Sequence, residues 1–195
     1  SSISSNTIWS TWCDNTGTMW IGTDKGVDSY NANITRFSTS QVLAPGGESK
    51  NNTNVYAALE DKAGNLWLGV LGSGLVLKSK TGTVSYFQNI AGNASSLSDN
   101  NVFCIYEDSN GTIWVGTYNG LNEYNKATGK FTVYRHTEGD VFSISNNNIR
   151  CITEDKSGML WVGTYGGGLN SYNKTTRKFT SYKVSSTPGT ISSDI

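Results

Sequence analysis

The sequence predicts an all-β fold in which one four-stranded unit is repeated four times. A tryptophan recurs every 47 residues along the 195-residue chain, at Trp20, Trp67, Trp114 and Trp161. A glycine two residues after each tryptophan and an aspartate six residues before it keep the same interval. A repeat of about 40 to 50 residues, made of short strands and glycine-containing turns, is typical of β-propellers. The chain is therefore expected to hold four propeller blades.

The third repeat shows most clearly why each strand is expected. Val102 to Glu107 and Thr112 to Thr117 are short runs rich in β-branched and aromatic residues, separated by an Asp-Ser-Asn-Gly turn. Leu121 to Tyr124 and Lys130 to Tyr134 continue the pattern, with turns rich in Asn and Gly between the runs. Such runs and turns predict antiparallel strands joined by tight hairpins. No segment carries the 3.6-residue period of a helix.

The ends of the repeats suggest a longer array. The repeats fall at about residues 1–47, 48–94, 95–141 and 142–189, and a fifth begins at 190–195. The segment ISSN near the start of the chain reappears as ISSD at its end, in both cases just before a first strand. The sequence therefore predicts a single domain over residues 1–195 that is a partial propeller.

Each recurrent residue has a packing role in this prediction. The four tryptophans are expected to be mostly buried between blades, as structural residues rather than ligand contacts. The recurrent aspartate is expected to hold the first hairpin of each repeat. The third and fourth strands are expected to supply further core side chains. These are Tyr30, Leu77, Tyr124 and Tyr172 in the third strands, and Phe37, Val84, Phe131 and Phe179 in the fourth strands.

Composition argues against several classes of function. Fifteen basic and fifteen acidic side chains cancel, so no net positive charge favours nucleic acid or an anionic membrane. No apolar run approaches the roughly 20 residues that span a bilayer, so no membrane insertion is expected. Cys104 and Cys151 share one repeat position with Ser10 and Ala57, which predicts a small buried residue rather than a disulfide. No cysteine–histidine cluster occurs, so neither a metal nor a cofactor is predicted.

The third and fourth repeats resemble a known family. Their sequences, NNVFCIYEDSNGTIWVGTYNGLNEYN and NNIRCITEDKSGMLWVGTYGGGLNSYN, are similar to the two-component regulator propeller repeat. The first repeat departs from the pattern with Cys13 in place of a glutamate, and the second with Val70 in place of a threonine. The resemblance implies seven-bladed propellers in the periplasmic sensor region of hybrid two-component histidine kinases that respond to complex carbohydrates. It also implies that this chain is an input module and not an enzyme.

Two sets of loops are expected on one face of such a propeller, namely those between second and third strands and those leading into first strands. These loops differ between repeats while the strands do not, and variable loops on a rigid scaffold often carry ligand contacts. One loop-proximal position holds Trp9, Tyr56, Phe103 and Arg150 in successive repeats. Tyrosine faces and asparagine side chains suit an oligosaccharide. The predicted ligand-binding residues are Tyr118, Asn119, Tyr165, Asn147 and Arg150.

Two other functions stay open on sequence alone. A scaffold propeller that binds only proteins would use the same loops, and a propeller hydrolase or lyase would need carboxylates gathered in one pocket. No catalytic residue is predicted, because the single histidine, His136, has no recurrent carboxylate partner. The blade faces left bare at both ends of a partial propeller predict self-association in place of the missing blades of a parent protein.

Overall fold

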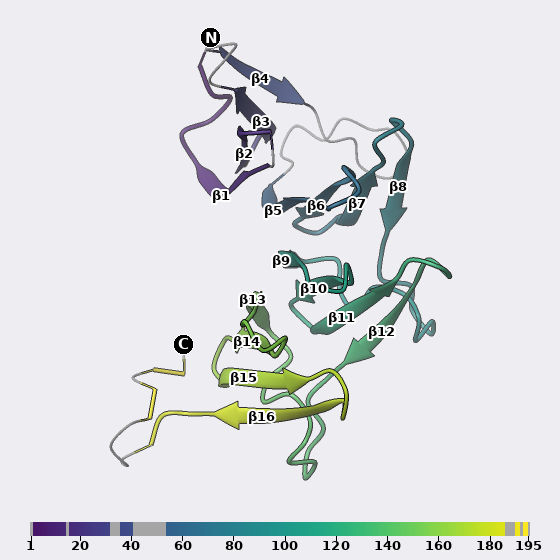
Figure 1. The fold of residues 1–195 in the computed structure, drawn as a ribbon, viewed down its shortest axis with the longest axis vertical. Helices are drawn as coiled ribbons and strands as arrows, with labels where there is room; N and C mark the ends of the chain where they lie inside the picture. Colours follow the sequence, from purple (N-terminus) through teal and green to yellow (C-terminus); the bar gives the residue numbers. More distant parts are fainter. Residues whose placement is uncertain are drawn as a thin grey trace. The chain divides into compact units, whose positions relative to one another are not determined.

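The computed structural model describes residues 2–14, 16–31, 36–40, 54–185, 190–191 and 193–194, and for 36–40 it describes the backbone only. Every regular element in this part of the chain is a β-strand, and the strands form four antiparallel sheets of four (Figure 1). Each sheet takes its strands from one repeat, in sequence order. The predicted all-β fold of four four-stranded blades, part of a propeller, is therefore confirmed.

The strand bounds agree closely with the repeat pattern. Blade 1 comprises β1 (Ile8–Cys13), β2 (Thr18–Thr23), β3 (Gly26–Asn31) and β4 (Arg36–Ser40). Blade 2 comprises β5 (Val55–Glu60), β6 (Leu66–Val70), β7 (Gly74–Lys78) and β8 (Val84–Phe87). Blade 3 comprises β9 (Val102–Glu107), β10 (Ile113–Thr117), β11 (Gly120–Asn125) and β12 (Lys130–Tyr134). Blade 4 comprises β13 (Ile149–Glu154), β14 (Leu160–Thr164), β15 (Gly168–Asn173) and β16 (Lys178–Tyr182).

The chain divides into two compact units, which are described separately below. The first contains Ser1–Gln88 with Asn100–Val102, and so holds blades 1 and 2. The second contains Asn89–Asp99 with Phe103–Ile195, and so holds blades 3 and 4. The predicted junction between the first two repeats, the loop residues Asn52 and Thr53, and the side chain of Phe37 lie outside the described residues.

The recurrent aspartate has two roles in each first hairpin. In blade 2, Asp61 Oδ1 accepts hydrogen bonds from the backbone N–H groups of Ala63 and Asn65, at 3.0 and 2.9 Å. Asp61 Oδ2 accepts a further bond from the indole Nε1 of Trp67 at 3.0 Å. The indole bond recurs in the other three blades, at 3.1, 3.0 and 2.7 Å. The predicted turn role is confirmed, and the same carboxylate also fixes the orientation of the recurrent tryptophan.

Burial of the four tryptophans depends on the blade. Trp67 and Trp114 are 1% exposed, whereas Trp20 and Trp161 are half-buried. In the second unit, the Trp114 ring lies 5.6 Å edge-on from Tyr172 of the following blade. Trp161 instead packs on Tyr182 of its own blade, with ring centroids 5.6 Å apart. The predicted structural role holds, and in the second unit the fully buried indole is the one that the following blade contacts.

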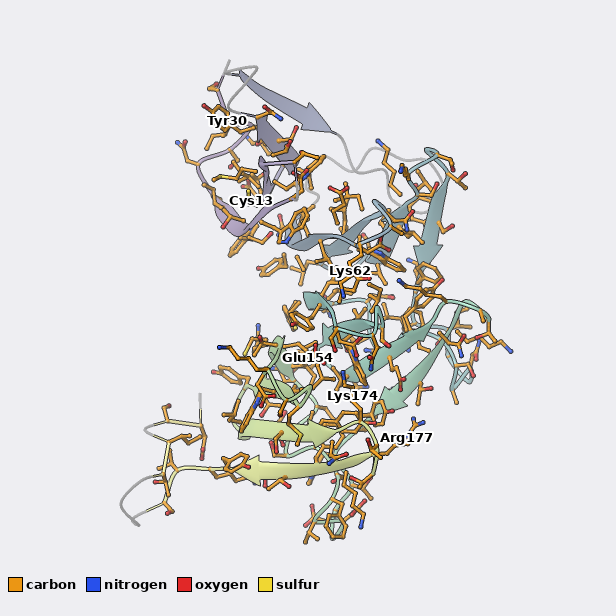
Figure 2. All side chains as sticks on the ribbon, in the orientation of Figure 1. Cys13, Tyr30, Lys62, Glu154, Lys174 and Arg177 are labelled. Atoms are coloured by element: carbon orange, nitrogen blue, oxygen red, sulfur yellow. The ribbon has the colours of Figure 1, made fainter. Side chains whose placement is uncertain are left out.

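An ionic cluster joins blades 3 and 4. Lys174 Nζ donates to Glu154 Oε1 of its own blade and, at 3.0 Å, to Asp108 Oδ2 of the preceding one. Glu154 also accepts from the backbone N–H and the hydroxyl of Ser109, at 2.6 and 2.9 Å. Figure 2 labels Glu154 and Lys174, which lie close together at this junction. Burial raises the pKa of both carboxyls, but the hydrogen bonds they accept, including those from Lys174, outweigh it and hold each pKa below its ordinary value.

The corresponding junction between blades 1 and 2 has a different charge balance. Glu60, the counterpart of Glu154, interacts with the Asp14 carboxylate of the preceding blade. Burial, followed by the charge of Asp14 and the hydrogen bond with it, raises the pKa of Glu60. Asp14 stays the more acidic partner: burial raises its pKa, but bonds from Thr16, Thr18 and the indole of Trp20 outweigh that and lower it.

Two sequence expectations about core positions are wrong in part. Tyr30, Tyr124 and Tyr172 pair with the residue just before the recurrent tryptophan, and in blade 2 that partner is Lys78, not Leu77. Lys78 of β7 therefore occupies the position at which the other blades have a tyrosine. In the same blade Val84 is 44% exposed, whereas Phe131 and Phe179 are buried.

The expected burial of the repeated cysteine position is also wrong for Cys151, which is exposed, while Cys104 is half-buried. Burial raises the pKa of the Cys104 thiol. A Cβ placed on Gly116 would meet both Cys104 Sγ and Ile149 of the following blade, whereas one on Gly163 would meet only Cys151 Sγ. The cysteine position is thus covered where the first strand of a following blade packs on it.

Candidate ligand-binding site

The loops predicted to share one edge are hydrogen-bonded to each other in both units. In blade 4, the N–H of Tyr165, in the turn between β14 and β15, donates to the carbonyl of Asn148 just before β13, at 2.9 Å. In blade 2, Leu71 makes the equivalent 3.0 Å bond to Asn54. The antiparallel pairing of the first two strands causes this arrangement, because the second strand ends beside the start of the first.

In blades 1, 2 and 4 the variable position is a β-bulge. In β1, Ile8 pairs with Thr23 and Ser10 with Gly22, so Trp9 has no partner across the strand pair. The register shifts at the same place in β5 and β13, around Tyr56 and Arg150. A bulge redirects a side chain away from the regular alternation of the strand. This local geometry explains why residue type at this position varies freely while its neighbours in the strand do not.

In the first unit two of these side chains stack on each other. The rings of Trp9 and Tyr56 lie 4.6 Å apart with an angle of 16° between their planes. Trp9 remains 42% exposed. Blades 1 and 2 therefore present an uncharged aromatic surface at this edge.

In the second unit the corresponding side chains form a cation–aromatic cluster. The guanidinium carbon of Arg150 lies 4.0 Å from the ring centroid of Phe103 and 5.3 Å from that of Tyr165. Arg150 is exposed and Tyr165 is 52% exposed, so both can reach a ligand. Contacts of this geometry are favourable because the π-face of an aromatic ring is electron-rich.

A cavity of about 300 Å³ lies beside this cluster, lined by residues that include Arg150, Cys151, Tyr165, Ile191 and Asp194. The carbonyl of Asp194 accepts from the N–H groups of Gly166 and Gly168, at 2.9 and 3.2 Å, and its Oδ1 accepts from the N–H of Val184 at 2.7 Å. The volume is at the lower end of the range of small-molecule sites, roughly 300–1,000 Å³.

The turn that carries Tyr165 is held by a polar network. Thr164 Oγ1 donates to the carbonyl of Gly168 at 3.0 Å and lies 3.3 Å from the hydroxyl of Ser145. Ser145 in turn donates its N–H to Asn170 Oδ1 at 3.0 Å, and Asn170 is fully buried. Ser98, Thr117 and Asn122 repeat these contacts in blade 3. Buried and fully bonded networks of this kind fix the backbone around a site.

The structure brings together some of the predicted ligand-binding residues. Arg150 and Tyr165 meet, together with Phe103, which the variable position indicated. Tyr118 occupies the equivalent turn of blade 3 and is 56% exposed. The carbonyl of Asn119 accepts from Arg135 Nε at 3.0 Å. Asn147 lies differently, because its Oδ1 accepts the backbone N–H of His136 at 2.7 Å and so holds the chain after β12.

The single histidine lies in the loop after β12. His136 Nδ1 is 2.9 Å from the carbonyl of Ile144, and its Nε2 is 3.6 Å from Glu138. Among the described residues, no three or more His, Cys, Asp or Glu side chains are grouped as a metal ion would require. The same part of the chain contains no helix long and apolar enough to cross a membrane.

These blades, with their variable bulge residues on a constant scaffold, define a β-propeller repeat protein. The sequence model for the two component regulator propeller matches residues 49–72, 96–119 and 143–166. Each matched segment contains the recurrent aspartate and tryptophan of one repeat, so three of the four repeats of this chain are similar to the two component regulator propeller repeat. No match was found among curated protein sequences.

Solved propeller structures are similar to this chain. The extracellular domain of a hybrid two component system from B. thetaiotaomicron is 25% identical over 94% of this chain, with a TM-score of 0.59. PorZ, a surface component of the type-IX secretion system of Porphyromonas gingivalis, gives 18% identity over 96% and a TM-score of 0.69. Virginiamycin B lyase from Staphylococcus aureus gives 16% over 93% and a TM-score of 0.68. At these low identities, the similarities to PorZ and to the lyase show only that the fold is shared.

This chain spans only part of each of these proteins. It covers 31% of the B. thetaiotaomicron domain, 28% of PorZ and 57% of the lyase.

Proposed function

We propose that this chain is a ligand-sensing part of an extracytoplasmic propeller in a hybrid two-component system, and that its ligand is an oligosaccharide. The observation that supports this most is the 25% identity over 94% of the chain to an extracellular domain of such a system. The three segments that match the two component regulator propeller model also support it. The proposal includes a periplasmic location and a histidine kinase outside these residues.

The binding surface in this proposal is the edge that carries the bulge residues and the turns after the second strands. Exposed aromatic rings offer flat apolar faces on which the C–H groups of a pyranose can pack. Tyr118 and Tyr165 occupy equivalent turns of successive blades and are each more than half exposed. Asn119 and Arg150 add hydrogen-bonding groups at the same edge. A repeated aromatic turn of this kind suits a ligand made of repeated sugar units.

The role proposed here is binding and not catalysis. The carboxylates that recur in every blade lie in the first hairpins, at the opposite end of the first strand from the bulge, where they accept bonds from the indoles and turn amides. The lyase neighbour shares the fold at 16% identity, and a fold by itself does not carry an activity.

Thermal denaturation of this chain against a library of oligosaccharides tests the proposal. A ligand that binds the folded state raises the melting temperature in a saturable way. We expect such a shift for at least one class of oligosaccharide, and expect Tyr165→Ala to reduce it. Lys156→Gln, a change at the exposed hairpin of the same blade, is the matched control and should keep the shift. A chain that responds to no oligosaccharide but captures a protein partner would instead be a protein-binding scaffold.

A further inference from the structure

We propose that Phe103, Arg150 and Tyr165 form a subsite for a carboxylate-bearing sugar, namely a hexuronic acid unit of an oligosaccharide. This inference rests on the proposed sensor function and adds the chemical class of its ligand. It starts from the positive charge of Arg150, which the bulge in β13 holds at the ligand-facing edge.

The charge of Arg150 is not neutralised within the described part of the chain. No carboxylate there lies within 4.0 Å of its guanidinium, although such pairs are found for Arg177, with Glu123 at 3.5 Å. Arg135 is used differently, since its Nε donates to the carbonyl of Asn119. Arg150 contacts two rings instead of an acid. An arginine held in place by aromatic faces keeps its N–H groups available for an anion.

The chemistry of the guanidinium favours a carboxylate. Its planar fork of N–H donors matches the two oxygens of a carboxylate, which gives paired, charge-assisted hydrogen bonds. The ring of Phe103, at 4.0 Å, restricts the side chain and so lowers the entropy lost on binding. The carboxylate of Asp194 also lines the adjacent cavity, but its Oδ1 accepts the N–H of Val184.

The neighbouring groups favour a sugar as the carrier of that carboxylate. Tyr165 presents a ring that is 52% exposed, next to a cavity of about 300 Å³. A hexuronic acid carries its carboxylate on the rim of a pyranose ring, so it can pair with Arg150 while its C–H face packs on Tyr165. The stacked Trp9 and Tyr56 of the first unit offer aromatic faces without a cation. The acidic specificity therefore belongs to the second unit.

Isothermal titration calorimetry of this chain with matched acidic and neutral ligands tests the inference. The probes are tetragalacturonic acid, a hyaluronan tetrasaccharide and an alginate tetramer, each beside its methyl-esterified form. We expect at least one acid to bind, with roughly tenfold or greater loss of affinity on esterification or in Arg150→Gln. Arg150→Lys should recover only part of the affinity, because it lacks the fork. Lys156→Gln removes the same charge at the far hairpin and should bind as the original chain does.

The outcomes separate this inference from the proposed function. Binding of neutral oligosaccharides with no preference for the acids, unchanged in Arg150→Gln, would overturn the acidic subsite and leave the sensor function standing. Binding of an acid that Arg150→Gln and Lys156→Gln weaken equally would also overturn it, since the effect would then be one of net charge. If no oligosaccharide of either kind binds, both the subsite and the proposed function are wrong for this chain. Circular dichroism of each variant confirms that it is folded.

Discussion

The junction between blades 1 and 2 and the junction between blades 3 and 4 place the same glutamate in opposite electrostatic surroundings. In the second unit, Glu154 receives Lys174 and two bonds from Ser109. In the first unit, Glu60 meets the carboxylate of Asp14. One junction has its cation between two acids, and the other has two acids in contact.

The difference comes from the position of one lysine and not from its absence. By register, Lys80 is the counterpart of Lys174, because Lys78 pairs with Leu66 as Tyr172 does with Leu160. Lys80 nevertheless makes no ion pair within 4.0 Å with any described carboxylate, although its charge does lower the pKa of Glu60 slightly against the larger opposing effects. Its backbone N–H donates to Asn65 Oδ1. A lysine at the same position of two repeats therefore forms the ionic contact in one repeat and not in the other.

Replacing Lys174 by Met has the largest expected effect. It leaves the carboxylates of Asp108 and Glu154, whose side chains are 1% and 6% exposed, without their shared cation. Breaking a buried ion pair from one side typically costs 3–5 kcal/mol, and since Lys174 itself is 20% exposed we expect about 3 kcal/mol. Urea denaturation at pH 7 measures it. The equivalent change at Lys126, which is 46% exposed and 3.6 Å from Glu107, should cost about 0.5 kcal/mol; equal losses would contradict the assignment.

The glutamates themselves should respond in opposite directions to an amide. Glu154→Gln replaces an acceptor of ionic hydrogen bonds and should destabilise the second unit by about 1–2 kcal/mol. Glu60→Gln gives Asp14 a permanent N–H donor in place of a repelling acid, so it should be neutral or stabilise the first unit by about 0.5 kcal/mol. Melting curves of the two variants at pH 7 provide the comparison. Destabilisation by both changes to the same extent would show that the two junctions are equivalent after all.

The same contrast predicts opposite dependence on pH. The folded-state pKa of Glu154 lies below its ordinary value of 4.5, so its stabilising contribution is present above that pH and is lost as the pH falls through the lowered pKa. The folded-state pKa of Glu60 is raised, so its contribution is present below pH 4.5 and is lost as the pH rises through the raised pKa. Acidification from pH 7 should therefore shrink the effect of Glu154→Gln and make Glu60→Gln less favourable. Melting temperatures of the original chain and of both variants, measured between pH 3.5 and 7, test how each substitution's effect changes with pH.

Self-association is the smallest effect that we expect. The face of blade 4 that carries Trp161 and Tyr182 lacks the neighbour that covers Trp114 in blade 3, and bare apolar faces favour association. A second copy could place its blade 1 there, but Cys13 stands where the glutamate of the ionic junction would be. The contact should therefore be weak. Sedimentation velocity at micromolar concentration should show a dimer fraction that Trp161→Lys abolishes, and a strict monomer of 21.1 kDa would contradict the prediction.

Much of the local structure could be predicted from the sequence because it depends on contacts within one repeat. Val102–Glu107 and Lys130–Tyr134 were expected at the bounds that β9 and β12 have. The aspartate of the first hairpin was expected from its distance to the turn glycine. Its second bond, to the indole six residues later, could have been inferred from the same period, since both residues recur together. The exposure of Cys151 could not have been inferred in this way, because burial of the cysteine position depends on contact with a following blade.

The candidate site was predictable in part for the same reason. Arg150 and Tyr165 were indicated by variation among equivalent loops, and the structure places them together with Phe103. Asn147 lies in an equally variable loop and was expected to contact a ligand, yet its side-chain oxygen accepts a hydrogen bond from the backbone N–H of His136. Sequence variation marks where a loop differs, whereas only the folded backbone shows whether a polar side chain bonds inward or faces solvent.

The sequence alone determined the repeat, its four strands and the variable position near the start of each first strand, because the period, turn residues and alternation act over a few residues. Only the tertiary structure decided which acid meets a lysine and which meets another acid. Those contacts join residues of different blades, such as Lys174 with Asp108, and a shift of one residue in a turn redirects them. Electrostatic contacts depend steeply on distance and burial, so equivalent glutamates of two repeats can carry opposite pKa shifts.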